Sequence, residues 1–248
     1  MSPELLSLIA WSTLDTLTMV ALAGSFGTLV GLPLGVFLAT SRANELFPAP
    51  NVNRILGLVV NATRSTPFII LVVAIVPLTR AIAGTSIGTR AAVVPLTIAA
   101  IPFIARVIEG AIREVDQGLV EAARAFGASP LQIVQKVLLP EALPAVTLAL
   151  TLAIVSLIGY SAMVGAVGGG GLGDLGIRYG YQRFMPEVMA TVVVVLIVLV
   201  QGVQTIGDRL HGFHDLGMWP GSDAHLDGFG VGNSRQRQGG DGGESERA

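Results

Sequence analysis

Long apolar runs, separated by short segments that carry the charges, dominate residues 1–207. About 20 consecutive, predominantly apolar residues cross the hydrocarbon core of a bilayer. Five runs approach or exceed that length, although Arg64 interrupts the second run and Arg106 closes the short third one. Since the runs lack the in–out alternation of barrel strands, we expect an all-α, polytopic membrane protein. The runs predict five transmembrane helices, at 14–41, 55–80, 91–108, 142–168 and 187–207.

The composition supports a membrane protein and excludes several other classes. Only 13% of the 248 residues are charged and 52% are hydrophobic, whereas soluble globular domains carry about 25% charged residues. An ordinary nucleic-acid-binding protein and most soluble enzymes are thereby excluded. The chain has no cysteine, so it cannot form disulfides or use a thiol nucleophile.

The basic residues of the short loops predict the orientation of the helices. One side of the membrane would hold seven Lys or Arg side chains, at Arg42, Arg54, Arg106, Arg113, Arg124, Lys136 and Arg209. The other side would hold four, at Arg80, Arg90, Arg178 and Arg183. Because short cytoplasmic loops carry the excess of positive charge, we expect the N-terminus outside and the C-terminus in the cytoplasm.

Residues 211–248 are rich in Gly, Ser and charged residues and lack periodic hydrophobic positions, so we expect a disordered cytoplasmic tail. All three histidines, His211, His214 and His225, lie there. Histidines in such a segment are expected to be solvated rather than metal ligands. The sequence therefore predicts no metal site and no cofactor.

Two local patterns bear on how the spans pack. Gly27, Gly31 and Gly35 recur at every fourth position of the first run, a spacing that lets helix backbones approach closely; packing within the chain is favoured over a contact between subunits. In the second run, Arg64-Ser65-Thr66-Pro67 indicates either a helix that starts near Pro67, with Ser65 or Thr66 as N-cap, or a kink. An Arg64 that holds the helix near the membrane interface is favoured over one that binds substrate.

The segment 117–138, between the third and fourth runs, predicts two short helices about a break. Gly127 would end the first helix in a left-handed conformation. Ser129 would then cap the second, with Pro130 in its first turn. Because isolated helices this short are marginal in water, lipid, the rest of the chain or a docked partner must hold them.

This segment resembles the EAA loop of permeases of ABC importers: Glu-Ala-Ala, three residues, Gly, nine residues, an aliphatic residue, one residue and Leu-Pro. In this chain the motif positions are Glu121, Ala122, Ala123, Gly127, Val137, Leu139 and Pro140. Segments 64–68 and 168–184 look like the methionine-importer subgroup, as does the five-span layout. The resemblance covers most of residues 10–210 and leaves the tail out.

The resemblance implies a permease subunit in a prokaryotic inner membrane, in which two copies pair with two copies of a separate ATPase. The EAA loops would dock on the ATPases, and an extracytoplasmic substrate-binding protein would deliver methionine to the outer face. The bilayer is the remaining partner, and no nucleic acid is implied. A permease for another small solute is the alternative within this class.

The sequence contains no nucleotide-binding loop, so any ATPase must be on another polypeptide. The single lysine, Lys136, stands in Val-Gln-Lys-Val, and no Gly-x-x-x-x-Gly-Lys-Ser/Thr loop occurs. The chain is therefore expected to be a transport subunit and not an enzyme. A stand-alone secondary transporter is disfavoured because the apolar runs hold no carboxylate apart from Asp15 at an edge. An intramembrane protease built on Asp174 lacks a second aspartate within another span.

Polar residues inside the expected spans are candidates for the translocation path, because lipid disfavours them. Ser156, Tyr160 and Met163 follow at spacings of four and three and so share one face of the fourth helix. We predict that this face and Asn61 line the path and that Met163 helps to close it. Ordinary helix packing, with hydroxyls bonded back to their own helix, is the alternative.

Overall fold

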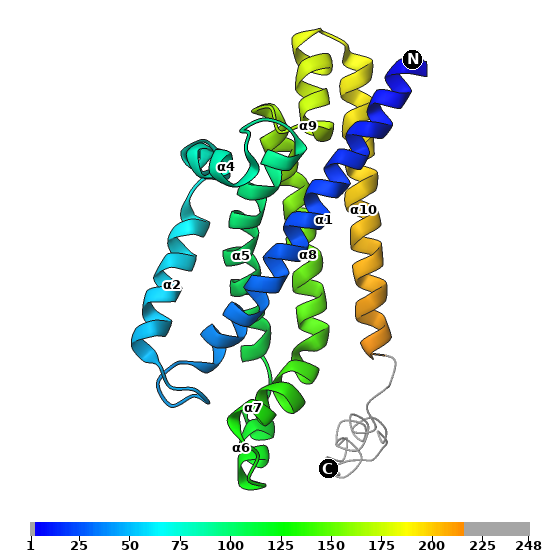
Figure 1. The fold of residues 1–248 in the computed structure, drawn as a ribbon. Helices are drawn as coiled ribbons and strands as arrows, with labels where there is room; N and C mark the ends of the chain where they lie inside the picture. Colours follow the sequence, from blue (N-terminus) through cyan, green and yellow to red (C-terminus); the bar gives the residue numbers. More distant parts are fainter. Residues whose placement is uncertain (1–2, 216–248) are drawn as a thin grey trace, which may run out of the picture.

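The computed structural model describes residues 3–215, and every regular element in that range is helical (Figure 1). Most of the expected tail at 211–248 lies outside the described residues, and α10 includes its first residues, 211–215. The α-helices are α1 (Pro3–Thr40), α2 (Pro50–Ser65), α3 (Phe68–Ala74), α4 (Val76–Ala83), α5 (Thr89–Arg113), α6 (Gln117–Ala125), α7 (Pro130–Ile133), α8 (Leu139–Ala166), α9 (Gly171–Leu175) and α10 (Pro186–Asp215). The π-helical segments are η1 (Val134–Leu138) and η2 (Gly176–Gln182).

Four stretches within the described residues are long and apolar enough to cross a membrane. They are α1, α5, the continuous stretch Pro130–Ala166 and the Pro186–His211 part of α10. The bent pair α2 and α3 is a fifth candidate span. The prediction of an all-α protein with five spans is confirmed when that pair counts as one span. α1 begins at Pro3, ahead of the start expected at residue 14.

The second span is broken where the sequence places Pro67. α2 and α3 meet there at 103°. Thr66 is extended, at φ −77° and ψ 127°, because a proline disfavours helical geometry in the residue before it. The expected N-cap is wrong: the Ser65 hydroxyl donates to Asn61 O at 2.8 Å and the Thr66 hydroxyl to Ala62 O at 3.1 Å. Both hydroxyls therefore bond back to the end of α2.

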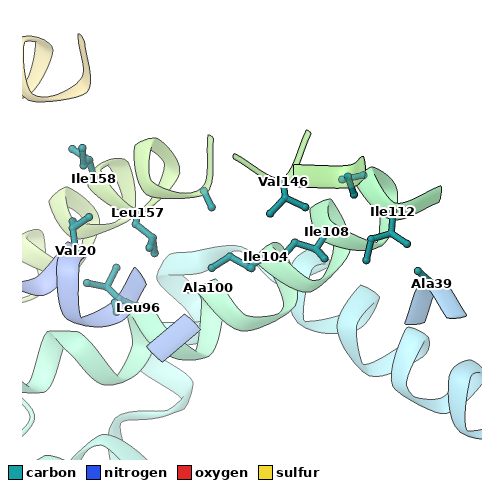
Figure 2. Close-up of a cluster of buried hydrophobic side chains, with 14 of the residues drawn as sticks. Val20, Ala39, Leu96, Ala100, Ile104, Ile108, Ile112, Val146, Leu157 and Ile158 are labelled. Carbon is teal, nitrogen blue, oxygen red and sulfur yellow. The ribbon is translucent and has the colours of Figure 1, made fainter. Parts of the chain in front are cut away.

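α1 crosses the bundle obliquely and packs most closely on α5 (Figure 1). The glycine stripe lies at this crossing, as expected. A Cβ on Gly27 would lie 2.6 Å from Ala100 Cβ, and one on Gly35 would lie 2.6 Å from Ala105 O. Figure 2 shows the neighbouring core, in which Ala100 and Ile104 of α5 lie across from side chains of α8. The glycines therefore serve packing within the chain.

One continuous helix made of α9 and η2, the α9–η2 helix, follows the glycine run at the end of the bundle that also holds the start of α1 (Figure 1). Gly168 and Gly170 have φ of 90° and 80° and turn the chain after α8. The α9–η2 helix packs on α1, where Leu172 N–H donates to the Thr16 hydroxyl at 2.9 Å. Leu172 and Leu175 are buried. The expected break at the glycines is thus observed, and it leads into a packed element.

Candidate functional site

The EAA-like segment lies at the end of the bundle opposite the α9–η2 helix (Figure 1). Asp116 caps α6, its carboxylate accepting from Gly118 N–H at 2.8 Å. Gly127 has the expected left-handed φ of 78°. Ser129 N–H donates to Gln132 Oε1 at 2.9 Å, and Gln132 N–H donates to the Ser129 hydroxyl at 3.4 Å. This capping box confirms the predicted start of the second helix.

The second helix of the loop does not end at residue 138 as a separate element. It runs on through η1 into α8, so Pro130–Ala166 is continuous over 37 residues. Leu139 N–H donates to Val134 O in the π-helical turn, immediately before Pro140, which has no N–H to donate. α7 is therefore joined rigidly to α8, without an intervening loop.

The structure divides the motif residues into two groups. Ala123, Val137 and Leu139 are partly buried and pack on the main hydrophobic core of the chain. The others face solvent, and they are Glu121, Ala122, Gly127 and Pro140. The first group fastens the loop to its own domain, whereas the second is available to another molecule.

An exposed phenylalanine, Phe126, lies beside the solvent-facing motif residues and was not predicted from the sequence. The Phe126 side chain is 91% exposed, the largest fraction among the exposed large hydrophobic residues of the described chain. Leu119 and Leu131 are also exposed nearby in the loop. Contiguous exposed apolar side chains mark interaction surfaces. The sequence signal for this exposed side chain was an aromatic residue directly before Gly127, which ends the helix.

A recess of about 150 Å³ lies at the break of the second span. Phe68 and Tyr160 stack in it, with ring centroids 4.5 Å apart and planes at 16°. The Arg64 guanidinium lies 5.9 Å from the centroid of the Phe103 ring, within the range of a cation–π contact. The lining residues are Thr63, Arg64, Thr66, Phe68, Leu71, Ala99, Phe103 and Tyr160.

Of the four residues predicted for the path, only Tyr160 lines this recess. Asn61 is exposed on α2, and its Oδ1 accepts from Arg106 Nη2 at 2.7 Å. Ser156 donates back to Leu152 O at 2.8 Å, as in the packing alternative. Met163 is 48% exposed on α8. The structure therefore does not bring the four side chains together in one pocket.

A buried carboxylate at the ends of α1, α2 and α5 was also missed. Glu109 is 2% exposed and forms ion pairs with Arg42, Arg106 and Arg113. Arg106 extends the network to Asn61. The spacing of Glu109 from Arg106 and Arg113, three and four positions, was visible in the sequence. Arg106 therefore contributes a specific contact in addition to its place at the end of a span.

Residues 31–219 match the family model described as the binding-protein-dependent transport system inner membrane component. The chain belongs to this family. It is accordingly a multi-pass inner-membrane permease component of an ABC transporter, and the ATPase is a separate subunit.

The relatives of this permease component include two that cover most of the chain. A probable D-methionine transport system permease protein MetI of Vibrio cholerae is 57% identical over 203 residues, which are 82% of this chain and 90% of that protein. The D-methionine transport system permease protein MetI of Escherichia coli strain K12 is 50% identical over 165 residues, 66% of this chain and 76% of that protein.

Solved structures agree with the family assignment. A chain from the MetNI methionine ABC transporter in an inward-facing conformation has a TM-score of 0.85 and 48% identity, covering 86% of this chain and 99% of that one. An amino acid ABC transporter solved with histidines has a TM-score of 0.70 at 20% identity, over 86% of this chain and 100% of that one. The second match supports the fold alone.

Proposed function

We propose that this chain is the permease subunit of an ATP-driven importer that carries methionine into the cytoplasm. The observation that carries the proposal is the 48% identity and TM-score of 0.85 to the MetNI chain over 86% of this chain. The D-methionine permeases of Vibrio cholerae and Escherichia coli support the same substrate. Another small solute carried by the same kind of transporter is the second candidate.

The coupling function rests on the exposed part of the EAA-like loop. Glu121, Ala122 and Gly127, together with Phe126, would face a cleft on the ATPase subunit. Small side chains at Ala122 and Gly127 permit close approach of the partner, and Phe126 supplies an apolar contact. Ala123, Val137 and Leu139 hold the loop on the permease core, and Pro140 lies where the loop joins α8. Two ATPase copies and two permease copies would form the transporter.

The outer face would receive an extracytoplasmic substrate-binding protein. With the EAA-like loop in the cytoplasm, the start of α1 would lie outside and the end of α10 inside. The α9–η2 helix, with the turn that follows it, then lies at the outer surface. It presents Tyr181 and Phe184, which are 69% and 86% exposed, and Arg183, whose guanidinium lies 4.3 Å from the centroid of the Tyr179 ring. Exposed aromatic and arginine side chains are typical of binding interfaces.

Asn61, Ser156, Tyr160 and Met163 stay the candidates for the translocation path. Tyr160 lies in the recess at the helix break, which places it next to polar groups of another span. Met163 is exposed on α8 and could meet its counterpart across a two-fold axis, because symmetry brings equivalent residues together at such an axis.

The test is a pull-down of tagged, detergent-solubilised permease from its native membrane. Wild type should bring down an ATPase, and the double variant Glu121→Arg plus Gly127→Trp should not. Glu187→Arg, a charge reversal at an exposed residue at the start of α10, is the matched control and should retain the ATPase. Methionine uptake by vesicles that contain the complex and the binding protein then tests the substrate. Uptake of a different solute, with none of methionine, would contradict it.

A further inference from the structure

Arg64, an exposed residue near the end of α2, places a positive charge inside the broken second span without a negative partner. Among residues 3–211, no carboxylate lies within ion-pair distance of its guanidinium, and its closest defined contact is the Phe103 ring at 5.9 Å. Phe103 lies 14 residues after the start of α5 and 10 before its end. At 1.5 Å per residue, Phe103 lies about 18 Å from the start and about 8 Å from the end of the span expected at 91–108.

An ionisable side chain inside a membrane span that lines a recess and has no carboxylate partner indicates a functional site. A broken transmembrane helix at mid-depth is a general setting for substrate binding in transporters. The hydroxyls of Thr63 and Thr66 donate back to carbonyl groups of α2. The guanidinium is therefore the strongest donor that the recess leaves for a ligand.

The walls and size of the recess define the remainder of the ligand. Phe68, Tyr160 and Phe103 supply three aromatic rings. A cavity of about 150 Å³ accommodates an apolar group the size of benzene, which matches the side chain of one amino acid. Aromatic rings also make favourable contacts with a thioether sulfur. No Asp or Glu is among the lining residues, so an α-ammonium group meets no opposite charge there.

We propose that this recess binds the transported amino acid on its way across the membrane, through its carboxylate and its side chain. The Arg64 guanidinium pairs with the α-carboxylate, a geometry that its planar donors favour. The side chain lies against the rings of Phe68, Tyr160 and Phe103, and the amino group is not recognised. This proposal rests on the function proposed above and adds a substrate site within the permease itself.

The first experiment uses wild-type permease–ATPase complex without nucleotide or binding protein. Equilibrium dialysis measures bound radiolabelled methionine against two unlabelled competitors. N-acetylmethionine keeps the carboxylate and loses the charged amine, so it should compete within a fewfold of methionine. Methioninamide keeps the amine and loses the carboxylate, so it should compete at least about tenfold more weakly. The proposal is overturned if methionine does not bind, or if the two competitors displace bound methionine equally well.

The second experiment uses variants of the recess in complexes that elute like wild type on size-exclusion chromatography. Arg64→Gln should weaken methionine binding at least about tenfold, and Arg64→Lys should restore part of it. Arg80→Gln is the matched control, because Arg80 is exposed on α4 and outside the recess. Tyr160→Leu should weaken binding more than Tyr160→Phe, which keeps the ring. Unchanged binding by Arg64→Gln overturns the site.

Uptake assays separate this proposal from the function on which it rests. If wild-type vesicles import methionine and Arg64→Gln imports it with an unchanged KM, the site is wrong and the function stands. If wild-type vesicles import another amino acid and Arg64→Gln raises the KM for it, the site stands with a different substrate. If the imported solute has no carboxylate, both are wrong.

Discussion

Arg42 Nη2 donates to Glu109 Oε1 at 3.1 Å, although the two residues are 67 positions apart in the chain. The contact joins the loop after α1 to the last turns of α5, and Arg106 and Arg113 reach the same carboxylate from α5 itself. α5 leads within a few residues into α6 of the EAA-like loop. The buried carboxylate therefore fixes the base from which that loop projects.

Replacing Glu109 by Gln should destabilise the permease substantially. The three arginines would lose their shared counter-charge, and removing one partner of a buried ion pair costs about 3–5 kcal/mol. Because the arginines are partly exposed, we expect a loss of roughly 2 kcal/mol, which lowers the melting temperature by about 4–8 °C for a chain of this size. Thermal unfolding in detergent measures the change in melting temperature. Glu187→Gln, at an exposed position, should shift it little; equal shifts would contradict the role of Glu109.

A methyl group added at Gly35 should disturb the crossing of α1 and α5. A Cβ there would lie 2.6 Å from Ala105 O and 2.8 Å from Ile108 Cβ, neither of which can move freely. Overpacking of this kind costs about 1–3 kcal/mol. Gly57→Ala is the matched control, because a Cβ on this glycine of α2 meets nothing within 4 Å and alanine is the better helix former. In thermal unfolding, the melting temperature of Gly35→Ala should be lower than that of wild type, and that of Gly57→Ala should be equal or higher.

Features set by neighbouring residues could be predicted from the sequence. The left-handed Gly127 and the capping box of Ser129 and Gln132 depend on a few adjacent positions, and both occur in the structure. The close approach at Gly27 and Gly35 follows from a four-residue spacing along one helix. The lengths of the five apolar runs likewise predict the spans.

Features that depend on distant residues could not be predicted. The stacking of Phe68 on Tyr160 joins residues of two different spans, and the ion pair of Arg42 and Glu109 joins the loop after α1 to α5. The sequence allowed a start or a kink at Pro67, and tertiary packing selected the sharp bend. It also gave no way to tell Ala123, which packs on the core, from the exposed Ala122 beside it.

Phe126→Ser should weaken the association of the permease with its ATPase. The side chain is 91% exposed in the subunit alone, and a buried aromatic anchor typically loses at least about tenfold in affinity when truncated. Phe184→Ser is the matched control, since this phenylalanine is 86% exposed in the turn between η2 and α10, at the opposite end of the bundle. Titration of purified ATPase against immobilised permease measures both. Equal binding by Phe126→Ser and wild type would remove Phe126 from the docking surface.

Met163→Ala should raise the passive leak of substrate through vesicles that contain the transporter without ATP. If the 48% exposed Met163 side chain closes the path at the two-fold axis, alanine leaves an opening that no nearby residue fills, because Ala162 and Ala166 are small. Leu152→Ala is the matched control, as Leu152 is 50% exposed on the same helix, three turns away. Efflux of preloaded radiolabelled methionine should rise severalfold for Met163→Ala alone. A rise shared by both variants would indicate loosened packing, and an unchanged leak would show that Met163 is not the gate.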